Sequence, residues 1–217
     1  MKAPLDIPVS SSDWSGIMSS AGGDLRRLDH VIRFSSVPYS VPESVSAHSF
    51  WVCLYAALIH RRLMSTQEPK LDLAVTLHAL THDLPECLTG DVVRTFKYAS
   101  KDLKRAVDVT ETAMFEERMT AEVKSLVASI GDAVPSDDMK YVRTVVKAAD
   151  FMSLFQYMNR EWNRGNLEMR PFVKRMRVDL MAEAIKLKVG IWYEEALSHL
   201  YISMADSAMS EPPERTA

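Results

Sequence analysis

The sequence predicts an all-α protein, a single bundle of about six to eight helices. Only seven glycines occur in 217 residues, and few runs show the two-residue alternation of strands. Apolar residues instead recur at spacings of three and four positions, which is the period of a helix. At this length one sizeable core is expected, and no internal repeat is visible.

Three regions are expected along the chain. They are a flexible arm rich in Ser, Gly and Pro over 1–23, the helical domain over 24–204, and a disordered tail over 205–217. Within the domain, the apolar period predicts helices over 24–34, 45–64, 71–81, 101–130, 136–162 and 172–204, with one break allowed in 101–130. Ser44 is the expected N-cap of the helix over 45–64, Ser136 is the expected cap of the helix over 136–162, and Pro85 is expected to start a new helical turn.

Composition excludes several classes of function. A formal net charge of −3 argues against a broad nucleic-acid-binding surface. No apolar run approaches the roughly 20 residues of a membrane span, and the N-terminus lacks the pattern of a signal peptide. Cys53 and Cys87 lie inside apolar helical patterns and are expected to be reduced core residues. We therefore expect a cytoplasmic protein without nucleic-acid or membrane partners.

A His-Asp pair, His82-Asp83, directly follows the apolar helical run over 71–81. Glu86 and Asp91 occur shortly after it. A buried carboxylate or imidazole is costly unless a partner compensates it. An adjacent His and Asp at the end of a buried helix therefore indicate a metal site, provided that the rest of the chain supplies further ligands.

Two more polar side chains are predicted to face the core. At 100° per residue, Asp150 shares a helix face with Val146 and Ser153, and His48 shares one with Val52. An unpaired carboxylate in the middle of an inward face would be destabilising or would become neutral. Asp150 therefore needs a cationic partner, which is a metal ion or, alternatively, an arginine or lysine. For His48 the alternative is a hydrogen-bonded core histidine.

A single metal site would use His48, His82, Asp83 and Asp150, which come from three predicted helices. Two imidazole nitrogens and two carboxylates suit one divalent ion, Co²⁺, Mn²⁺, Zn²⁺, Fe²⁺ or Mg²⁺, with positions left for water and substrate. A competing zinc site would pair His78 with His82, four positions apart. That pair lacks the glutamate beside the first histidine that a metalloprotease motif requires.

The order His48, His82-Asp83, Asp150 resembles that of the HD-domain phosphohydrolases, and most closely their bacterial 5′-deoxynucleotidase branch. Further similar stretches are Arg33-Phe34, 43–49, Thr89-Gly90-Asp91, Lys97-Tyr98, 146–150 and Gly165-Asn166. The likeness extends over 24–166, and the final helix matches in character alone. It implies an HD-domain helical fold, one divalent metal held by those four residues, and hydrolysis of a phosphate ester by a metal-activated water.

The resemblance also implies catalytic and substrate-binding roles. Glu86 would orient or deprotonate the attacking water, and Asp91 would act as the acid at the leaving 5′-oxygen. Arg33 would hold the phosphate with its planar fork of donors. Phe34 would crowd out a 2′-hydroxyl and so favour 2′-deoxyribose. Without such roles, Glu86 is a charge at a helix start and Asp91 an N-cap.

The expected reaction releases a deoxynucleoside and phosphate from a 2′-deoxynucleoside monophosphate. Related small HD enzymes, some from phages, instead remove the triphosphate from dNTPs, notably dATP, and this is the alternative. Lys97 and Arg94 are expected to bind substrate, Arg94 as a contact for additional phosphates or else as a solvated loop charge. A second alternative is a nucleotide-binding HD module without turnover, against which the complete ligand set and Glu86 argue.

Members of this family often self-associate, so a homo-oligomer is expected, in the host cytoplasm if the chain is phage-encoded. The apolar final helix is expected to be core or interface, and its large residues are Met176, Met181, Ile185, Ile191, Trp192, Leu197 and Leu200. One departure is Ala47, which stands where the family usually has a glutamate beside the first ligand histidine. A carboxylate orients a metal-bound imidazole, so the resemblance leaves open what orients His48.

Overall fold

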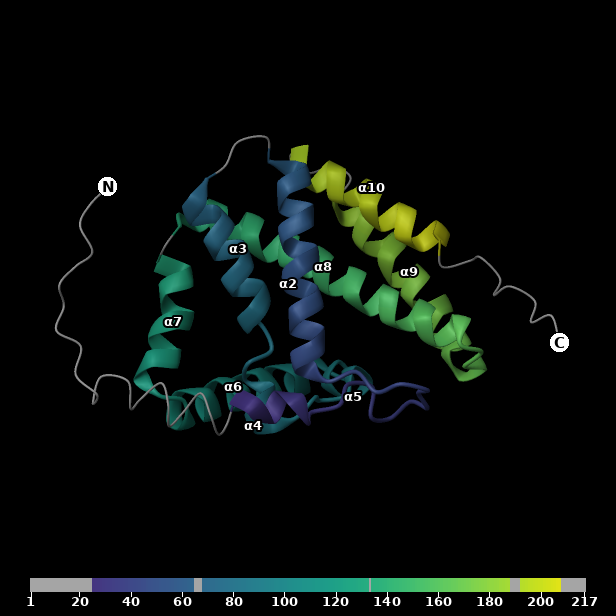
Figure 1. The fold of residues 1–217 in the computed structure, drawn as a ribbon, viewed down its shortest axis with the longest axis horizontal. Coiled ribbons are helices and arrows are strands. Elements are labelled where there is room, and N and C mark those ends of the chain that lie inside the picture. The colour runs from purple at the N-terminus through teal and green to yellow at the C-terminus, as the bar shows by residue number, and fades with distance from the viewer. Residues whose placement is uncertain (1–24, 65–67, 133, 188–191, 208–217) are drawn as a thin grey trace.

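The structure is a computed structural model that describes residues 25–64, 68–132, 134–187 and 192–207. In these residues the elements are helical (Figure 1): η2 Leu25–Asp29, α2 Val45–Leu63, α3 Pro69–Thr81, α4 Glu86–Thr89, α5 Arg94–Lys97, α6 Lys101–Arg118, α7 Ala121–Asp132, α8 Ser136–Asn163, η3 Leu167–Met169, α9 Arg170–Leu187 and α10 Trp192–Ser207. The all-α prediction is confirmed. The predicted arm over 1–23, and the part of the predicted tail beyond Ser207, lie outside the described residues.

The start and end signals in the sequence act largely as predicted. The Ser44 hydroxyl accepts a hydrogen bond from the Ala47 N–H at 3.2 Å, so Ser44 caps α2. Pro85 separates α3 from α4. The N-cap of α8 is Pro135, and Ser136 is already helical, one position away from the prediction. The helix predicted over 101–130 breaks between α6 and α7, where Met119 has an extended backbone.

The prediction of one helix over 172–204 is wrong. The segment forms two helices, α9 and α10, which pack against each other (Figure 1). Leu180 and Leu197 are buried together in the same core, and the Ser198 hydroxyl donates to the Ala184 carbonyl at 2.9 Å. α10 also continues to Ser207, three residues into the predicted tail, because Ala205 is fully buried.

The large residues of this segment divide between core and surface. Met176 and Leu197 are buried, whereas Ile185 is 66 % exposed and Met181 lies on the surface. Ile191 and the side chain of Trp192 lie outside the described part of the structure. α9 and α10 are therefore chiefly a core element with one exposed apolar edge.

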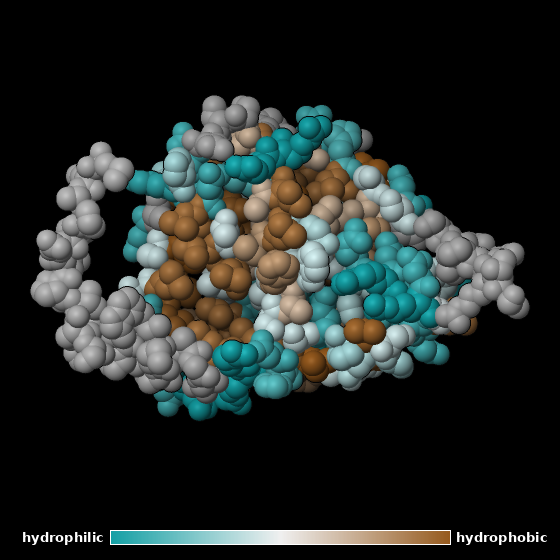
Figure 2. All heavy atoms as spheres, in the orientation of Figure 1, coloured by the Kyte–Doolittle hydropathy of each residue, from teal (hydrophilic) through white to brown (hydrophobic). Residues whose placement is uncertain are grey.

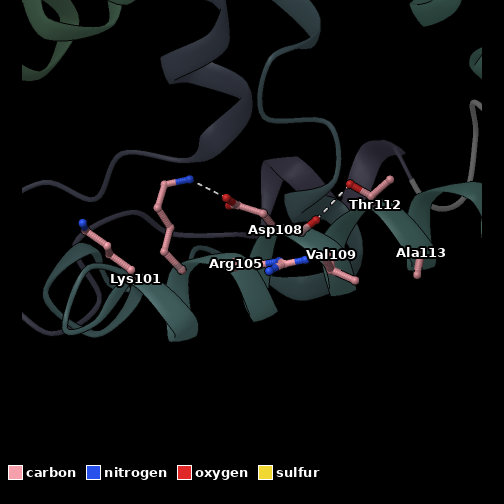
Figure 3. A pocket seen from close by; sticks show the side chains of 7 residues that line it. Lys101, Arg105, Asp108, Val109, Thr112 and Ala113 are labelled. Atoms are coloured by element: carbon pink, nitrogen blue, oxygen red, sulfur yellow. Dashed lines mark hydrogen bonds and ion pairs between the residues drawn. The ribbon is translucent and has the colours of Figure 1, made fainter.

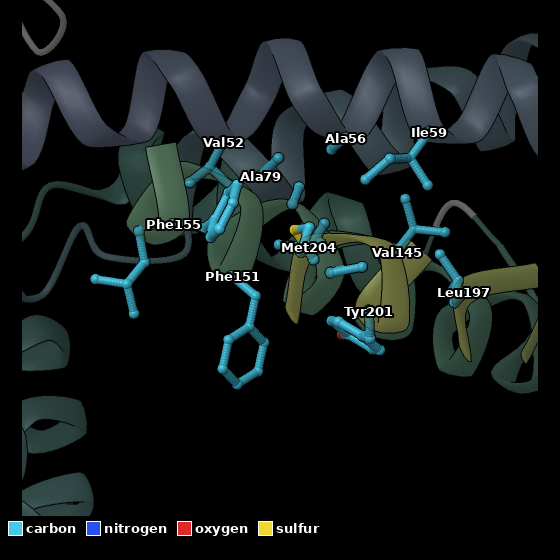
Figure 4. Close-up of a cluster of buried hydrophobic side chains, with 14 of the residues drawn as sticks. Val52, Ala56, Ile59, Ala79, Val145, Phe151, Phe155, Leu197, Tyr201 and Met204 are labelled. Atoms are coloured by element: carbon cyan, nitrogen blue, oxygen red, sulfur yellow. The ribbon is translucent and has the colours of Figure 1, made fainter. Parts of the chain in front are cut away.

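The long helix α8 is the centre of the fold, and α2, α3, α9 and α10 pack around it. Figure 4 shows the packing between Val52 and Ile59 of α2, Phe151 of α8 and Tyr201 of α10. The rings of Phe151 and Tyr201 meet edge to face, with centroids 5.6 Å apart. The close packing of α8 fixes the direction of its buried side chains.

A smaller apolar cluster lies at the other end of α2. It joins η2, α4, α6 and α7 through Leu28, Val45, Cys87, Phe115, Met119 and Val123. His48 is one helical turn from Val45 in this cluster and one turn from Val52 in the larger one. The candidate site therefore lies where the two apolar clusters meet. Among the described helices, none is long and apolar enough to cross a bilayer.

Candidate active site

His48 is fully buried on α2, with polar atoms around both ring nitrogens. Its Nδ1 atom lies 3.0 Å from the Ser153 hydroxyl and 2.6 Å from Nη1 of Arg33. Its Nε2 atom lies 3.1 Å from Asp150 Oδ1 and 3.6 Å from Asp83 Oδ2. Burial, and then the nearby Arg33 cation, lower the pKa of His48. The imidazole is therefore held neutral, which is the form that binds a metal ion.

His82 and Asp83 follow the last turn of α3. The Nδ1 atom of His82 donates to the Ala79 carbonyl at 2.8 Å, which leaves the lone pair on Nε2. That Nε2 atom lies 3.2 Å from Asp83 Oδ2, and the His82 ring lies 5.4 Å from the ring of His48, centroid to centroid. The helix end thus aims both side chains toward α2.

These side chains fit one divalent metal ion. The Nε2 atoms of His48 and His82 are buried and make no hydrogen bond to any described residue. Together with Asp83 they offer ligand atoms that lie within 4.8 Å of one another. Two donor atoms on one zinc ion are about 3.3 Å apart in a tetrahedral site, which is close to the separations seen here. His78 does not belong to this group, so the competing pair His78 and His82 is not assembled.

Asp150 of α8 lies next to this group, with its side chain 41 % exposed. Its removal from bulk water would raise the pKa of Asp150, but His48, Arg33 and His82 outweigh that effect and lower the pKa overall. The carboxylate is therefore ionised 3.1 Å from His48, although Asp150 is not among the residues whose ligand atoms all lie within 4.8 Å of one another.

Glu86 and Asp91 lie beyond the metal-binding group. The Oε2 atom of Glu86 is buried without a hydrogen-bond partner among the described residues. Burial, together with the negative charges of Asp83 and Asp91, raises the pKa of Glu86 to about 9. Asp91 accepts a hydrogen bond from the Phe34 N–H at 3.2 Å. An unpaired buried carboxyl beside other carboxylates favours a nearby cation and proton transfer.

Arg33 and Phe34 are positioned by the chain segment before α2. Arg33 makes an ion pair of 3.0 Å with Glu43, and its guanidinium carbon lies 5.0 Å from the centroid of the Phe34 ring. The Phe34 ring stacks on Tyr157 of α8, with centroids 5.1 Å apart and planes 5° from parallel. Because guanidinium can only donate, its contact with His48 Nδ1 requires the proton on Nε2. Metal binding through Nε2 requires the opposite tautomer, so Arg33 must then turn toward Glu43 or an anion.

Lys97 lies apart from the metal-binding group. Its Nζ atom donates to Glu111 at 2.9 Å and makes an ion pair of 3.3 Å with Asp108, both on α6. The backbone of Arg94 belongs to α5, but its side chain lies outside the described part of the structure. The structure therefore brings Arg33, Phe34, Glu86 and Asp91 toward the metal-binding group and directs Lys97 to α6.

Four residues around the site were given no role on the basis of the sequence. They are Glu43, which pairs with Arg33, and three residues of α8: Ser153, Tyr157 and Glu161. The α8 residues follow Asp150 at spacings of three, four and four, and the helical period placed Ser153 on the Asp150 face but did not assign it a partner. Ala47 is exposed, and Ser153 contacts His48 Nδ1 in place of a neighbouring glutamate.

A hollow of about 540 Å³ lies along α6 and is lined by Lys101, Lys104, Arg105, Asp108, Val109, Thr112 and Ala113 (Figure 3). Within it, Lys104 forms an ion pair with Asp108, and the Thr112 hydroxyl donates to the Asp108 carbonyl at 2.9 Å. None of the predicted site residues lines it. The hollow is separate from the candidate active site.

Comparison with known proteins finds similar sequences and similar folds. The chain is 29 % identical over 148 residues to a dATP triphosphohydrolase of Salmonella phage PMBT28, covering 65 % of this chain and 68 % of the relative. The fold is similar to that of the HD phosphohydrolase DatZ of cyanophage S-2L, a structure solved with dA and one catalytic Zn²⁺ ion. The TM-score is 0.55 and the sequence identity is 18 %, and the match covers 85 % of this chain and 95 % of DatZ. It is also similar to the HD-domain phosphohydrolase lin2634 of Listeria innocua, with a TM-score of 0.60 at 17 % identity, covering 87 % of this chain and 96 % of that one.

The two structural likenesses establish the HD-domain helical fold. A family model, 5′-deoxynucleotidase YfbR-like, matches residues 23–199, which include all the site residues described above. The chain belongs to the YfbR-like 5′-deoxynucleotidase family and is thus an HD-domain deoxynucleotide phosphohydrolase.

Proposed function

We propose that the protein hydrolyses 2′-deoxynucleoside 5′-monophosphates to deoxynucleosides and orthophosphate, with one divalent metal ion held by His48, His82, Asp83 and Asp150. The observation that carries the proposal is the close group of His48, His82 and Asp83, whose ligand atoms lie within 4.8 Å of one another. The Nε2 atom of each histidine is buried and faces a carboxylate oxygen, and two imidazoles with a carboxylate are common ligands of a divalent ion. Membership of the YfbR-like family supports the substrate class.

When bound, the metal ion supplies an acidified water and positive charge at the phosphoryl oxygens. Glu86, whose Oε2 atom is buried without a hydrogen-bond partner among the described residues, would take a proton from the attacking water. The water oxygen forms a bond to phosphorus while the bond from phosphorus to the 5′-oxygen breaks. Asp91, which is negatively charged beside Glu86, would take up a proton from Glu86 or from solvent and pass it to the departing oxygen, and Arg33 would neutralise the remaining phosphate charge. Atoms and charges then balance as deoxynucleoside plus orthophosphate.

The raised pKa of Glu86 bears on this assignment. A carboxyl with a pKa of about 9 is protonated at neutral pH and cannot accept a proton. A cation held by the adjacent Asp83 lowers that pKa, because it offsets the negative charges that raised it. Glu86 therefore acts as a base when the site is loaded, and the protonated form belongs to the metal-free protein.

The Phe34 ring gives the proposed preference for 2′-deoxyribose. Its backbone N–H is held by Asp91 and its ring by Tyr157, so the ring borders the same region as the predicted acid. A ring packed against a sugar leaves no room for a 2′-hydroxyl. Phe34 would therefore reject ribonucleotides by crowding.

The alternative is removal of triphosphate from dATP, which the phage relative's name supports. Attack of the same water on the α-phosphorus would serve either substrate. Two further phosphates need additional cations, yet Lys97 is paired with both Glu111 and Asp108. This pairing favours the monophosphate. A non-catalytic nucleotide-binding module is the second alternative, and the unpaired carboxyl of Glu86 argues against it.

The test is to incubate the protein with dAMP, AMP and dATP and to separate the products by chromatography, with Zn²⁺, Mn²⁺ or Co²⁺ added after EDTA treatment. We expect deoxyadenosine and orthophosphate from dAMP, little turnover of AMP, and recovery of activity by metal after EDTA. Triphosphate released from dATP would favour the alternative. Activity that is indifferent to EDTA would overturn the mechanism.

We also propose that the protein is a homo-oligomer of the cytoplasm that associates through the outer face of α2 and α3. Figure 2 shows apolar surface gathered over these helices. Large apolar side chains of α2 and α3 are between 41 and 58 % exposed: Phe50, Leu54, Leu58, Leu73 and Leu80. No Asp, Glu, Lys or Arg occurs between Val45 and Ile59. Monomeric proteins rarely expose apolar patches of more than a few hundred Å².

A second copy of the chain fits this face better than a charged partner does, because the α2 part of the face, residues 45–59, carries no Asp, Glu, Lys or Arg to be matched. Five half-exposed side chains of this size offer on the order of 400–500 Å². A standard interface buries about 800 Å² on each partner and is most apolar at its centre. The patch is therefore large enough for the centre of a two-fold contact in which the same face pairs with itself.

A further inference from the structure

The segment that carries Arg33 and Phe34 forms a closed loop before α2. The Arg33 N–H donates to the Glu43 carbonyl and the Val45 N–H donates to the Val31 carbonyl, both at 2.9 Å. These bonds flank an antiparallel bridge that closes the base of the loop. Phe34 is the first residue after this base and has a φ of 58°, a left-handed conformation that a bulky side chain rarely adopts. Such a conformation persists only where surrounding contacts hold it.

The tip of this loop is held by Glu161, near the end of α8. The Glu161 side chain is fully buried and accepts hydrogen bonds from the N–H groups of Ser40 and of Val41, the latter at 3.1 Å. Asn166 joins the same network, since its amide donates to Glu161 at 3.0 Å and to the Pro38 carbonyl at 2.9 Å. A carboxylate inserted into a loop in this way fixes several backbone groups at once.

Tyr157, one turn before Glu161 on α8, connects the loop tip to the Phe34 ring. Its hydroxyl donates to the Val41 carbonyl at 3.0 Å, while its ring stacks on Phe34. The same face of α8 therefore holds the loop at its tip and the aromatic side chain at its base. If the tip were released, Phe34 would lose part of what holds its left-handed conformation and would keep the ring stack, the Asp91 contact, the hydrogen bond from the Val37 N–H and the contact with Arg33.

We propose that Glu161 is a positioning residue for sugar selection: by fixing the loop tip against α8, it holds the Phe34 ring where it excludes a 2′-hydroxyl. The proposal rests on the proposed function, because it concerns the same substrate and the same ring. Glu161 does not touch substrate in this account. It acts through the backbone of Ser40 and Val41 and through the stacked pair Phe34 and Tyr157.

Glu161→Gln tests the proposal with little change of shape. The amide nitrogen cannot accept, so one of the backbone N–H groups facing the side chain loses its partner. We expect the ratio of kcat/KM for dAMP to kcat/KM for AMP to fall by about tenfold, since displacement of a positioning group by about 1 Å has effects of this order or larger. The ratio should fall because kcat/KM for AMP increases. Zinc affinity, measured by calorimetric titration, should remain that of the wild-type protein.

The matched control is Glu183→Gln on α9. Glu183 pairs with Lys147 and Lys186 and has no contact with the loop, so the same substitution there should leave the dAMP to AMP ratio unchanged. An equal fall in both variants would contradict a specific role of Glu161 and overturn the proposal. A fall in neither would overturn it as well.

A double-variant cycle separates positioning from a simple loss of stability. In a Phe34→Ala background the ring is absent, so Glu161→Gln should produce no further change in the ratio. Additive effects of the two substitutions would overturn the proposal. If Glu161→Gln does not fold, Tyr157→Phe and Asn166→Ala each remove part of the network and leave Glu161 charged. Each should lower the ratio by a smaller factor, and an unchanged ratio in both would overturn it.

Failure of the proposed function has a different result. In that case the wild-type protein releases no orthophosphate from dAMP. If wild-type protein hydrolyses dAMP selectively and Glu161→Gln retains the full selectivity, the proposed function stands and the role of Glu161 is overturned.

Discussion

The Nδ1 atom of His48 lies 3.0 Å from the hydroxyl of Ser153, which is 105 positions further along the chain. Arg33 is also near this nitrogen but can only donate. Among the described residues at Nδ1, Ser153 is therefore the one that can accept a hydrogen bond from a protonated Nδ1. With the proton on Nδ1, the Nε2 lone pair of His48 is free to bind a metal ion. This contact therefore makes the metal-binding form of His48 on α2 depend on a residue of α8.

Replacing Ser153 by alanine removes that acceptor. The tautomer of His48 with its proton on Nε2 is then favoured, and we expect zinc affinity to fall by about 10- to 100-fold. The measurement is calorimetric titration of the metal-free protein with Zn²⁺. Ser198→Ala is the control, because Ser198 is also buried and bonds a helix carbonyl but lies on α10. Equal zinc affinity in wild type and Ser153→Ala would contradict this role.

Asp83→Asn should remove a metal ligand without disturbing the helices. An amide is a much weaker ligand than a carboxylate for a divalent ion, so metal binding and dAMP hydrolysis should fall by at least about a hundredfold. Metal content after dialysis and product release report the loss. Circular dichroism should remain that of a helical protein, and retention of metal by the variant would argue against this site.

Glu86 predicts how the metal-free protein responds to pH. Burial, then Asp83 and Asp91, raise its pKa from 4.5 to about 9, so the folded state holds this proton more tightly than the unfolded chain does. The stability that the proton contributes is present below about pH 4.5 and is lost as the pH rises through about 9. Glu86→Gln removes the titrating group. Urea unfolding in EDTA should therefore show a smaller loss of stability with pH in the variant, and parallel curves would contradict the raised pKa.

The apolar face of α2 and α3 predicts the effect of a charge on association. Leu54→Glu places a carboxylate in the centre of the proposed contact, where burial without a partner is costly. We expect it to convert the oligomer to a monomer in sedimentation or light-scattering measurements. Ile185→Glu puts the same charge on the exposed edge of α9 and should leave the oligomer intact. Dissociation by Ile185→Glu alone would move the interface to α9 and α10.

The sequence predicted most elements because local signals govern them. The cap at Ser44, the break at Pro85 and the apolar period of α8 depend on residues within a few positions. The division of 172–204 into α9 and α10 depends instead on Leu180 and Leu197 packing in one core, a contact that periodicity alone does not reveal. Both segments have a helical pattern, so the pattern could not locate the turn between them.

The same distinction applies to the site. His48 could be grouped with His82 and Asp83 in advance because His48 faces inward by its helical phase, while His82 and Asp83 directly follow a buried helix. The partners of these residues come from distant segments: Ser153 for His48, Tyr157 for Phe34, and Glu111 for Lys97. Which of several polar groups meets a given side chain is decided by how helices pack. Lys97 shows this most clearly, because its charge could have served a phosphate but pairs with α6.

The stripe on α8 makes the length of this helix critical. Asp150, Ser153, Tyr157 and Glu161 follow one face, so inserting or deleting a single residue among them would rotate everything beyond it by about 100°. The proposed metal ligand Asp150, Ser153 beside His48, Tyr157 against Phe34 and Glu161 at the loop tip would then no longer share one face, although the chain would remain helical. A substitution at one of these positions removes the contacts of that residue alone. An insertion or deletion of one residue would remove the contacts of all the residues beyond it together.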